Sequence, residues 1–193
     1  MGRSDAELMR RWQRGDAAAF AALVERWQQP VARFLVRLVG HPDRAADLCQ
    51  EVFLRVLRAA PRYRERGQFS TWLFQIALNA ARDAGRRLRR APDPLPDAEK
   101  LPGGLRPPLT EPAADEVCER RELARAVACA VAELPPHLRE VLALRHDQGM
   151  SFEEMARVLG TPASTLKSRF AAALHRLRDR LHELGWSFEE SAP

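Results

Sequence analysis

The sequence predicts an all-α protein of two small helical domains joined by a proline-rich linker, with a helix-turn-helix in the C-terminal domain. Apolar residues recur at spacings of three and four through both halves of the 193-residue chain, as on one face of an α-helix. Alternating strand patterns and Asn-Gly hairpin turns do not occur. Residues 91–112 hold seven of the 14 prolines and a Gly-Gly pair, which excludes a continuous helix or a central strand there. We therefore expect domains at 1–90 and 116–184, a linker at 91–115 and a tail at 185–193.

The N-terminal half predicts several helices separated by short turns. Apolar residues at helical spacing come before and after a turn at Gly15-Asp16. Pro30 is expected to open a further helix over 31–38, because proline fits the start of a helix better than its interior. Residues 40–43, "GHPD", predict a turn, after which helices are expected over 45–57 and from Ser70 onward.

The C-terminal half predicts four helices. The first runs to about 134, and Pro135-Pro136 opens a second that Gly149 ends. Ser151 and Glu154 have the spacing of a capping box at the start of a short helix. After Gly160, the pair Thr161-Pro162 is expected to begin the last helix, with the threonine as its N-cap. The inward side of this last helix is predicted to be Leu166, Phe170, Leu174, Leu177 and Leu181.

Charge is distributed unevenly along the chain. The net charge of +5 divides into +9 for residues 1–90, −3 for 91–130 and −1 for 131–193. A basic N-terminal half favours a polyanionic partner, the alternative being a solvated basic surface. The absence of a long apolar run and of a signal peptide leads us to expect a cytoplasmic protein without membrane insertion. Three cysteines without metal-ligand spacing predict buried thiols and no metal site.

The predicted helix-turn-helix has a polar outer face that suits the major groove of DNA. With 100° per residue, Ser168 points outermost, with Ser164 and Thr165 beside it and Lys167 and Arg169 on the flanks. Small hydroxylated residues let a helix lie deep in the groove, and flanking cations reach phosphates or a guanine edge. The alternative is an ordinary helical hairpin with a solvated face. Cap, turn and basic face together favour DNA binding.

A second side of the predicted helix over 45–57 is acidic. Asp47, Glu51 and Leu54 lie on it at spacings of four and three, with Gln50 beside them. Carboxylates in a basic domain do not serve DNA binding, so either a basic protein partner or a solvated face accounts for them.

The segment "GQFSTWLFQIALNAARD", residues 67–83, predicts an exposed stripe that combines aromatic, amide and basic side chains. Trp72, Gln75, Asn79, Arg82 and Arg86 share this stripe, opposite a buried Leu/Ile/Ala face. Tyr63 and Phe69 precede it. Aromatic rings stack on unpaired bases while arginines hold phosphates, so single-stranded nucleic acid suits this pattern. In the alternative interpretation, Phe69 and Trp72 only close the core.

Several motifs in order resemble the bacterial sigma-70 family. They are "ADLCQEVFLRVLR", "YRERGQFSTWLFQIALNAARD", a proline-rich linker, "LPPHLREVLALRHDQGMSFEEMARVLG" and "TPASTLKSRF". The two-domain form resembles that of extracytoplasmic-function (ECF) sigma factors, and the resemblance covers residues 5–90 and 116–182.

The resemblance implies that the chain binds core RNA polymerase and directs it to promoters, helping to melt them. It implies contact with the polymerase clamp helices through Asp47, Gln50, Glu51 and Phe53. It implies that Tyr63, Phe69, Trp72 and Asn79 hold a base flipped from the −10 element, and that Thr165, Lys167, Ser168 and Arg169 contact the −35 element. An anti-sigma partner is usual in the family, and no cofactor is expected. Where the family often has further arginines, this chain has "AAAL", residues 171–174, which departs from the pattern.

Two other functions remain as alternatives. A stand-alone helix-turn-helix regulator of duplex operators would need neither the Tyr63–Asn79 constellation nor the acidic side of helix 45–57. An enzyme would need a nucleophile with its base, a phosphate loop or clustered carboxylates, and the sequence offers none of these. The two promoter elements of the family lie about two DNA turns apart, roughly 70 Å. A linker of about 22 residues spans at most about 70–80 Å, so it can bridge them.

Overall fold

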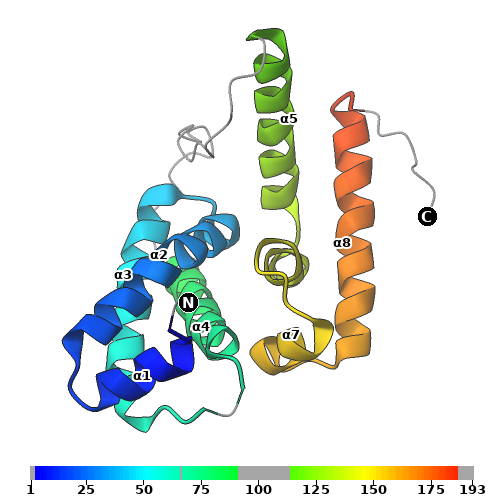
Figure 1. Ribbon diagram of the computed structural model, residues 1–193. Helices are drawn as coiled ribbons and strands as arrows, with labels where there is room; N and C mark the ends of the chain where they lie inside the picture. Colours follow the sequence, from blue (N-terminus) through cyan, green and yellow to red (C-terminus); the bar gives the residue numbers. More distant parts are fainter. Residues whose placement is uncertain (1–2, 66, 91–113, 187–193) are drawn as a thin grey trace.

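The computed structural model describes residues 3–65, 67–90 and 114–186, and the side chains of residues 120–186 within the last range. The predicted linker over 91–113 and the tail from residue 187 lie outside the described residues. Every regular element in the described part of the chain is helical, which confirms the all-α prediction. Figure 1 shows helices α1–α4 gathered on one side and α5–α8 on the other, with α5 and α8 side by side.

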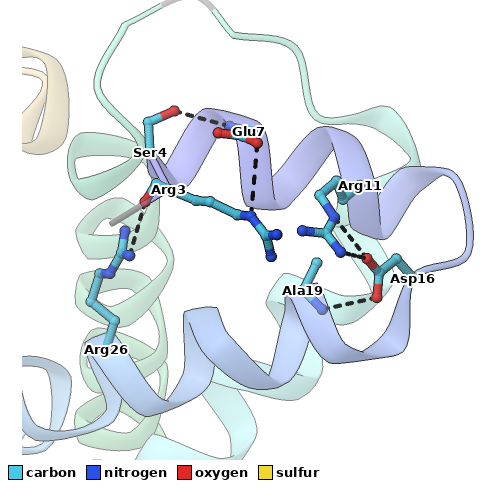
Figure 2. Close-up of polar contacts among 7 residues, drawn as sticks. All are labelled: Arg3, Ser4, Glu7, Arg11, Asp16, Ala19 and Arg26. Atoms are coloured by element: carbon cyan, nitrogen blue, oxygen red, sulfur yellow. Dashed lines mark hydrogen bonds and ion pairs between the residues drawn. The ribbon is translucent and has the colours of Figure 1, made fainter. Parts of the chain in front are cut away.

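The N-terminal group begins with α1 (Asp5–Gln13) and α2 (Ala17–Val39), which form a helical hairpin. Ser4 caps α1 by accepting a hydrogen bond from the Glu7 amide (3.2 Å). Asp16 caps α2 through the amides of Ala18 and Ala19, and its carboxylate also accepts a bond from the Arg11 guanidinium (2.7 Å), as Figure 2 shows in part. These contacts fix α1 against α2.

The rest of the N-terminal group comprises α3 (Pro42–Ala59), the 3₁₀ turn η1 (Ala60–Arg62) and α4 (Phe69–Arg90). Pro30 does not start a new helix as predicted; it lies inside the continuous helix α2. Burial of Val31, Phe34 and Leu35 on the following turns holds the helix together past the missing amide hydrogen bond. Gly40 then ends α2 in the left-handed conformation (φ 74°), which glycine adopts without strain.

The C-terminal group comprises α5 (Ala114–Glu133), α6 (Pro136–Leu142), a π-helical turn η2 (Ala143–Asp147), α7 (Phe152–Leu159) and α8 (Ala163–Glu183). Two predictions about α8 were wrong. Pro162 occupies the N-cap position, and the Thr161 hydroxyl instead donates to the Leu159 carbonyl (3.4 Å). Leu174 is 47 % exposed, and Ala173 is buried in its place, because α8 packs on α5 and α6 along a slightly rotated face.

The two groups share one hydrophobic core. Val141, Leu144 and Met155 of the C-terminal group are buried in the same cluster as Phe34 and Phe74 of the N-terminal group. Polar contacts cross the same boundary: Arg37 pairs with Asp147 (2.6 Å), and Arg139 donates to the Leu38 carbonyl (3.0 Å). The sequence could not decide whether the two parts touch; in this structure they pack closely.

Candidate nucleic-acid and protein interfaces

Helix α3 presents a stripe of acidic, amide and leucine side chains. Asp47 and Gln50 are exposed, Glu51 is half-buried, and Leu54 is 46 % exposed. Phe53 is half-buried and packs against the hydrophobic core, so less of its ring is available to a partner than the sequence suggested. An exposed leucine bordered by polar side chains is typical of a protein-binding surface.

A chain of ion pairs connects this α3 stripe to α4. The Arg55 guanidinium bonds the Glu51 carboxylate on its own helix (2.8 Å) and Asp83 on α4 (3.0 Å), and Asp83 also pairs with Arg86. Arg55 holds the pKa of both the Glu51 and the Asp83 carboxyl below its ordinary value. Both carboxylates are therefore ionised at neutral pH. Because these side chains are partly exposed, the pairs orient side chains more than they stabilise the fold.

Three aromatic rings meet at the start of α4. The Tyr63 ring centroid lies 4.7 Å from that of Trp72, and both lie close to Phe69, at 6.1 and 5.7 Å. Tyr63 and Trp72 are half-buried and keep part of their surface open. Phe69 is only 5 % exposed and packs against Trp27, with 6.1 Å between the ring centroids. Its ring is covered in this structure and supports the other two rings, whereas the sequence placed Phe69 among the DNA-contacting residues.

Tyr63 and Trp72 line an open pocket whose other lining residues are mostly polar. Burial raises the pKa of the Tyr63 phenol, so its hydroxyl stays protonated and able to donate a hydrogen bond at neutral pH. One wall comes from α7 of the C-terminal group, which packs against α4. The other residues of the lining are Arg64, Gly67, Gln68, Thr71, Gln75 and Arg157.

The polar stripe of α4 follows the aromatic rings as predicted, with one difference. Gln75, Asn79 and Arg86 are exposed. Arg82 is instead engaged by Glu140 of α6: its Nε and Nη2 donate to the two carboxylate oxygens at 2.8 and 2.7 Å. Glu140 is only 8 % exposed, and its carboxylate raises the pKa of Arg82. The Glu140 carboxylate thus binds the Arg82 guanidinium through two hydrogen bonds, as a phosphate group would.

The helix-turn-helix has the predicted local structure. The Ser151 hydroxyl accepts from the Glu154 amide (3.2 Å), while the Glu154 carboxylate accepts from the Ser151 amide (2.7 Å), completing the capping box at the start of α7. That amide bond holds the pKa of Glu154 below its ordinary value. Gly160 makes the turn in the left-handed conformation (φ 65°), and α8 follows directly.

The first turns of α8 carry the predicted DNA-contacting residues on their outer side. Ser164, Thr165 and Ser168 are exposed, whereas Arg169 is half-buried. Lys167 is exposed, with its ammonium 5.8 Å from the centroid of the Phe152 ring, a cation–π distance that restrains its direction. No acidic residue lies in the first turn of α8.

Sequence reasoning missed the residues that connect these surfaces. Arg55 and Asp83 could have been found from spacing, because Glu51–Arg55 is an i,i+4 pair and Asp83–Arg86 an i,i+3 pair. Glu140 and Arg157 give no comparable local signal, since their partners are far away in the sequence and are met only through tertiary packing.

The described part of the chain shows neither a candidate metal site nor a candidate membrane-spanning helix. No three His, Cys, Asp or Glu side chains there are grouped so that they could hold a metal ion. None of the described helices has the length and apolar character needed to cross a bilayer.

Comparison with known protein families matches both halves of the chain. Residues 23–91 match the sequence model of Sigma-70 region 2, and residues 124–177 match that of Sigma-70 region 4. The first match contains α3 and α4, and the second contains the helix-turn-helix.

Individual relatives extend over almost the whole chain. The RNA polymerase sigma-H factor of Pseudomonas aeruginosa is 34 % identical over 184 residues, 93 % of this chain and 95 % of the relative. The ECF RNA polymerase sigma-E factor of Escherichia coli is 32 % identical over 186 residues, 94 % of this chain and 96 % of the relative.

Solved structures agree with this assignment. CnrH, solved in complex with the cytosolic domain of CnrY, superposes with a TM-score of 0.69 at 27 % identity, covering 94 % of this chain and 99 % of CnrH. The sigma factor RpoE of Bartonella quintana, solved with the anti-sigma factor NepR, shares the fold with a TM-score of 0.63 at 22 % identity, covering 84 % of this chain and 96 % of RpoE. With both family regions in order and relatives above 30 % identity over nearly its full length, the chain belongs to the sigma-70 family, as an ECF-type RNA polymerase sigma factor that directs transcription initiation.

Proposed function

We propose that this sigma factor divides its work among three surfaces: α3 binds core RNA polymerase, the start of α4 holds the −10 element, and α8 contacts the −35 element. The observation that carries this proposal is the presence of an aromatic–amide–arginine surface and a helix-turn-helix on one chain, beside an acidic surface on α3. A stand-alone operator-binding regulator needs only the helix-turn-helix. The protein acts by binding and positioning, without catalysing a reaction itself.

The polymerase-binding surface consists of Asp47, Gln50, Glu51 and Leu54, with Phe53 supporting the helix from within. Carboxylates with an exposed leucine at their centre fit a basic helical partner, and the clamp helices of core polymerase are the partner that the family implies. The Glu51–Arg55–Asp83 chain of ion pairs joins this surface to α4. Polymerase and promoter would therefore contact adjoining sides of the α3–α4 pair.

The −10 surface is the pocket of Tyr63 and Trp72 together with the exposed amides of Gln75 and Asn79. We infer that an unpaired base enters the pocket and stacks on the rings, which is worth about 1–3 kcal/mol per base. The amide of Asn79 offers a donor and an acceptor to a base edge. Arg82 and Arg86 would hold the strand's phosphates.

The −35 surface is the outer side of α8 from Ser164 to Arg169. Its small side chains allow a close approach to the floor of the major groove, and its cations flank them. The "AAAL" segment after Arg169 provides no further cation until Arg176. Phosphate binding by α8 is therefore concentrated at Lys167 and Arg169.

This division assigns residues 1–90 to polymerase and −10 binding and 116–184 to −35 binding, with 91–115 as linker and 185–193 as tail. Both solved relatives with this fold were captured with another protein, the RpoE complex with an anti-sigma factor. We propose that this chain too is held by an anti-sigma factor, and that it works in the cytoplasm, where core polymerase is found.

The packed arrangement of the two groups differs from what a promoter requires. The −10 and −35 elements lie about 70 Å apart, whereas here α7 packs against α4 and Arg157 lines the pocket of Tyr63 and Trp72. We infer that the α1–α4 and α5–α8 groups separate when both elements are bound. The linker is long enough to allow this.

The direct test of the proposal is run-off transcription with purified core polymerase. Core alone should start at random, whereas core with this protein should start at defined positions that sequencing of the transcripts will identify. Strong specific binding of the isolated chain to duplex DNA, with no effect on core polymerase, would instead support a stand-alone regulator.

Replacing Arg169 by alanine should weaken use of the −35 element and lower the salt dependence of promoter binding. Loss of one phosphate contact reduces the slope of log K against log salt by about 0.9. The slope is measured by titrating holoenzyme onto promoter DNA at several salt concentrations. Arg176→Ala, beyond the "AAAL" segment, is the matched control. A slope unchanged by Arg169→Ala would remove Arg169 from the phosphate-binding set.

A further inference from the structure

Helix α1 holds the backbone that carries Tyr63. The Gln13 side chain reaches from the end of α1 and donates through Nε2 to the carbonyl oxygen of Ala60 (2.8 Å) and to that of Tyr63 (2.9 Å). Ala60 is the first residue of the 3₁₀ turn η1, and Tyr63 is its C-cap, so the two carbonyls lie at opposite ends of the turn. A primary amide has two N–H donors, and Gln13 can therefore donate one to each of these carbonyls.

A second contact on the same side of α1 acts on the same loop. The Arg10 guanidinium, one turn before Gln13, pairs with the Glu65 carboxylate at 2.6 Å. Helix α1 is itself fixed to α2 by the Arg11–Asp16 pair and by Arg26, which bonds the Arg3 carbonyl (Figure 2). The support behind the loop is therefore attached to α2 by polar contacts, although α1 lies outside the residues that match Sigma-70 region 2.

The loop itself has little regular structure to hold it. After η1 ends at Arg62, the backbone of residues 63–65 belongs to no helix. The Tyr63 ring nevertheless has to stay against Trp72, 4.7 Å between centroids, for the pocket to exist. A loop whose conformation is fixed before binding loses less entropy when a ligand arrives.

We propose that Gln13 is a positioning residue for the −10 pocket: its two hydrogen bonds to η1 keep the Tyr63 ring beside Trp72, ready for an unpaired base. This inference rests on the proposed function of Tyr63 and Trp72. In this proposal Gln13 makes no contact with DNA and acts only through the backbone of residues 60–63. Arg10 adds a further restraint through its exposed ion pair with Glu65.

The test uses Gln13→Met in the holoenzyme, because methionine keeps the length of the side chain and adds no charge. Binding of a fluorescent single strand carrying the −10 element is measured beside binding of a scrambled strand. We expect Gln13→Met to bind the −10 strand about threefold to tenfold more weakly, in line with the loss of two neutral hydrogen bonds. Binding of the scrambled strand and affinity for core polymerase should stay unchanged.

Two further variants separate the possible results. Gln29→Met makes the same change at an exposed position of α2 and should have no effect. Trp72→Ala tests the pocket itself and should abolish the preference for the −10 strand.

If Trp72→Ala removes the preference and Gln13→Met does not, the positioning role of Gln13 is wrong and the proposed role of the pocket stands. If Gln13→Met lowers core affinity and scrambled-strand binding in parallel with −10 strand binding, Gln13 is only structural. If neither variant changes the preference, the proposed −10 function of the pocket fails as well.

Discussion

Replacing Asn79 by alanine is expected to reduce transcription from the preferred −10 element about tenfold and to flatten the preference among −10 variants. The amide is exposed on α4, two helical turns after Trp72, so it faces the strand that the aromatic pocket would hold. Hydrogen bonds from an amide to a base edge discriminate between bases by about 1–3 kcal/mol, and 1.4 kcal/mol corresponds to a factor of ten. The measurement is run-off transcription from a set of promoters that differ at single −10 positions.

The exposed position of Asn79 makes this variant easy to interpret. Removing a side chain from the surface of a helix leaves the core intact, and alanine favours the helix. Affinity for core polymerase should therefore match the wild type. Gln29→Ala, at an exposed position of α2, is the matched control for loss of a surface amide outside the −10 surface. If Asn79→Ala and the wild type transcribe all −10 variants in the same order, Asn79 does not select the base.

Helical periodicity predicted most of the fold, and it failed where packing overrides local preference. The turns at Gly15 and Gly160 and the capping box at Ser151 were found, because each depends on a few adjacent residues. Pro30 was assigned to a helix start, whereas the buried residues beyond it keep α2 continuous. The exposure of Leu174 was missed because an idealised 100° rotation cannot say which of two adjacent apolar residues faces the core.

A site residue could likewise be predicted only where the residues that determine its position are close to it in the sequence. Exposure of Asn79 and Arg86 was predicted from helix phase alone. The sequence left two positions open for Phe69, because an aromatic residue before a helix can either face solvent or close the core, and only its contact with Trp27 decides between them. The partner of Arg82 could not be predicted, since Glu140 lies 58 residues away across the linker.

The Arg82–Glu140 pair leads to the second large effect. Replacing Glu140 by glutamine is expected to shift the chain by about tenfold toward separated groups, and to increase binding of a −10 strand by the protein without core polymerase. Glutamine keeps the shape of the buried side chain but removes the charge that holds the guanidinium. Hydrogen bonds to charged groups contribute about 1.5–3 kcal/mol. The lower part of this range applies, because the Arg82 side chain is 39 % exposed and screened by solvent.

Small-angle X-ray scattering of the free protein measures the separation as an increased radius of gyration, and fluorescence anisotropy measures the strand binding. Glu133→Gln is the matched control. Glu133 pairs with Arg180 entirely within the C-terminal group (2.8 Å), so its substitution removes the same charge without touching the boundary between the groups. Arg82→Gln should open the chain as Glu140→Gln does, but it should not increase strand binding, because it also removes a proposed phosphate contact. An unchanged radius of gyration in both Glu140→Gln and Arg82→Gln would mean that the shared apolar core, through residues such as Leu144 and Met155, holds the groups together without help from this ion pair.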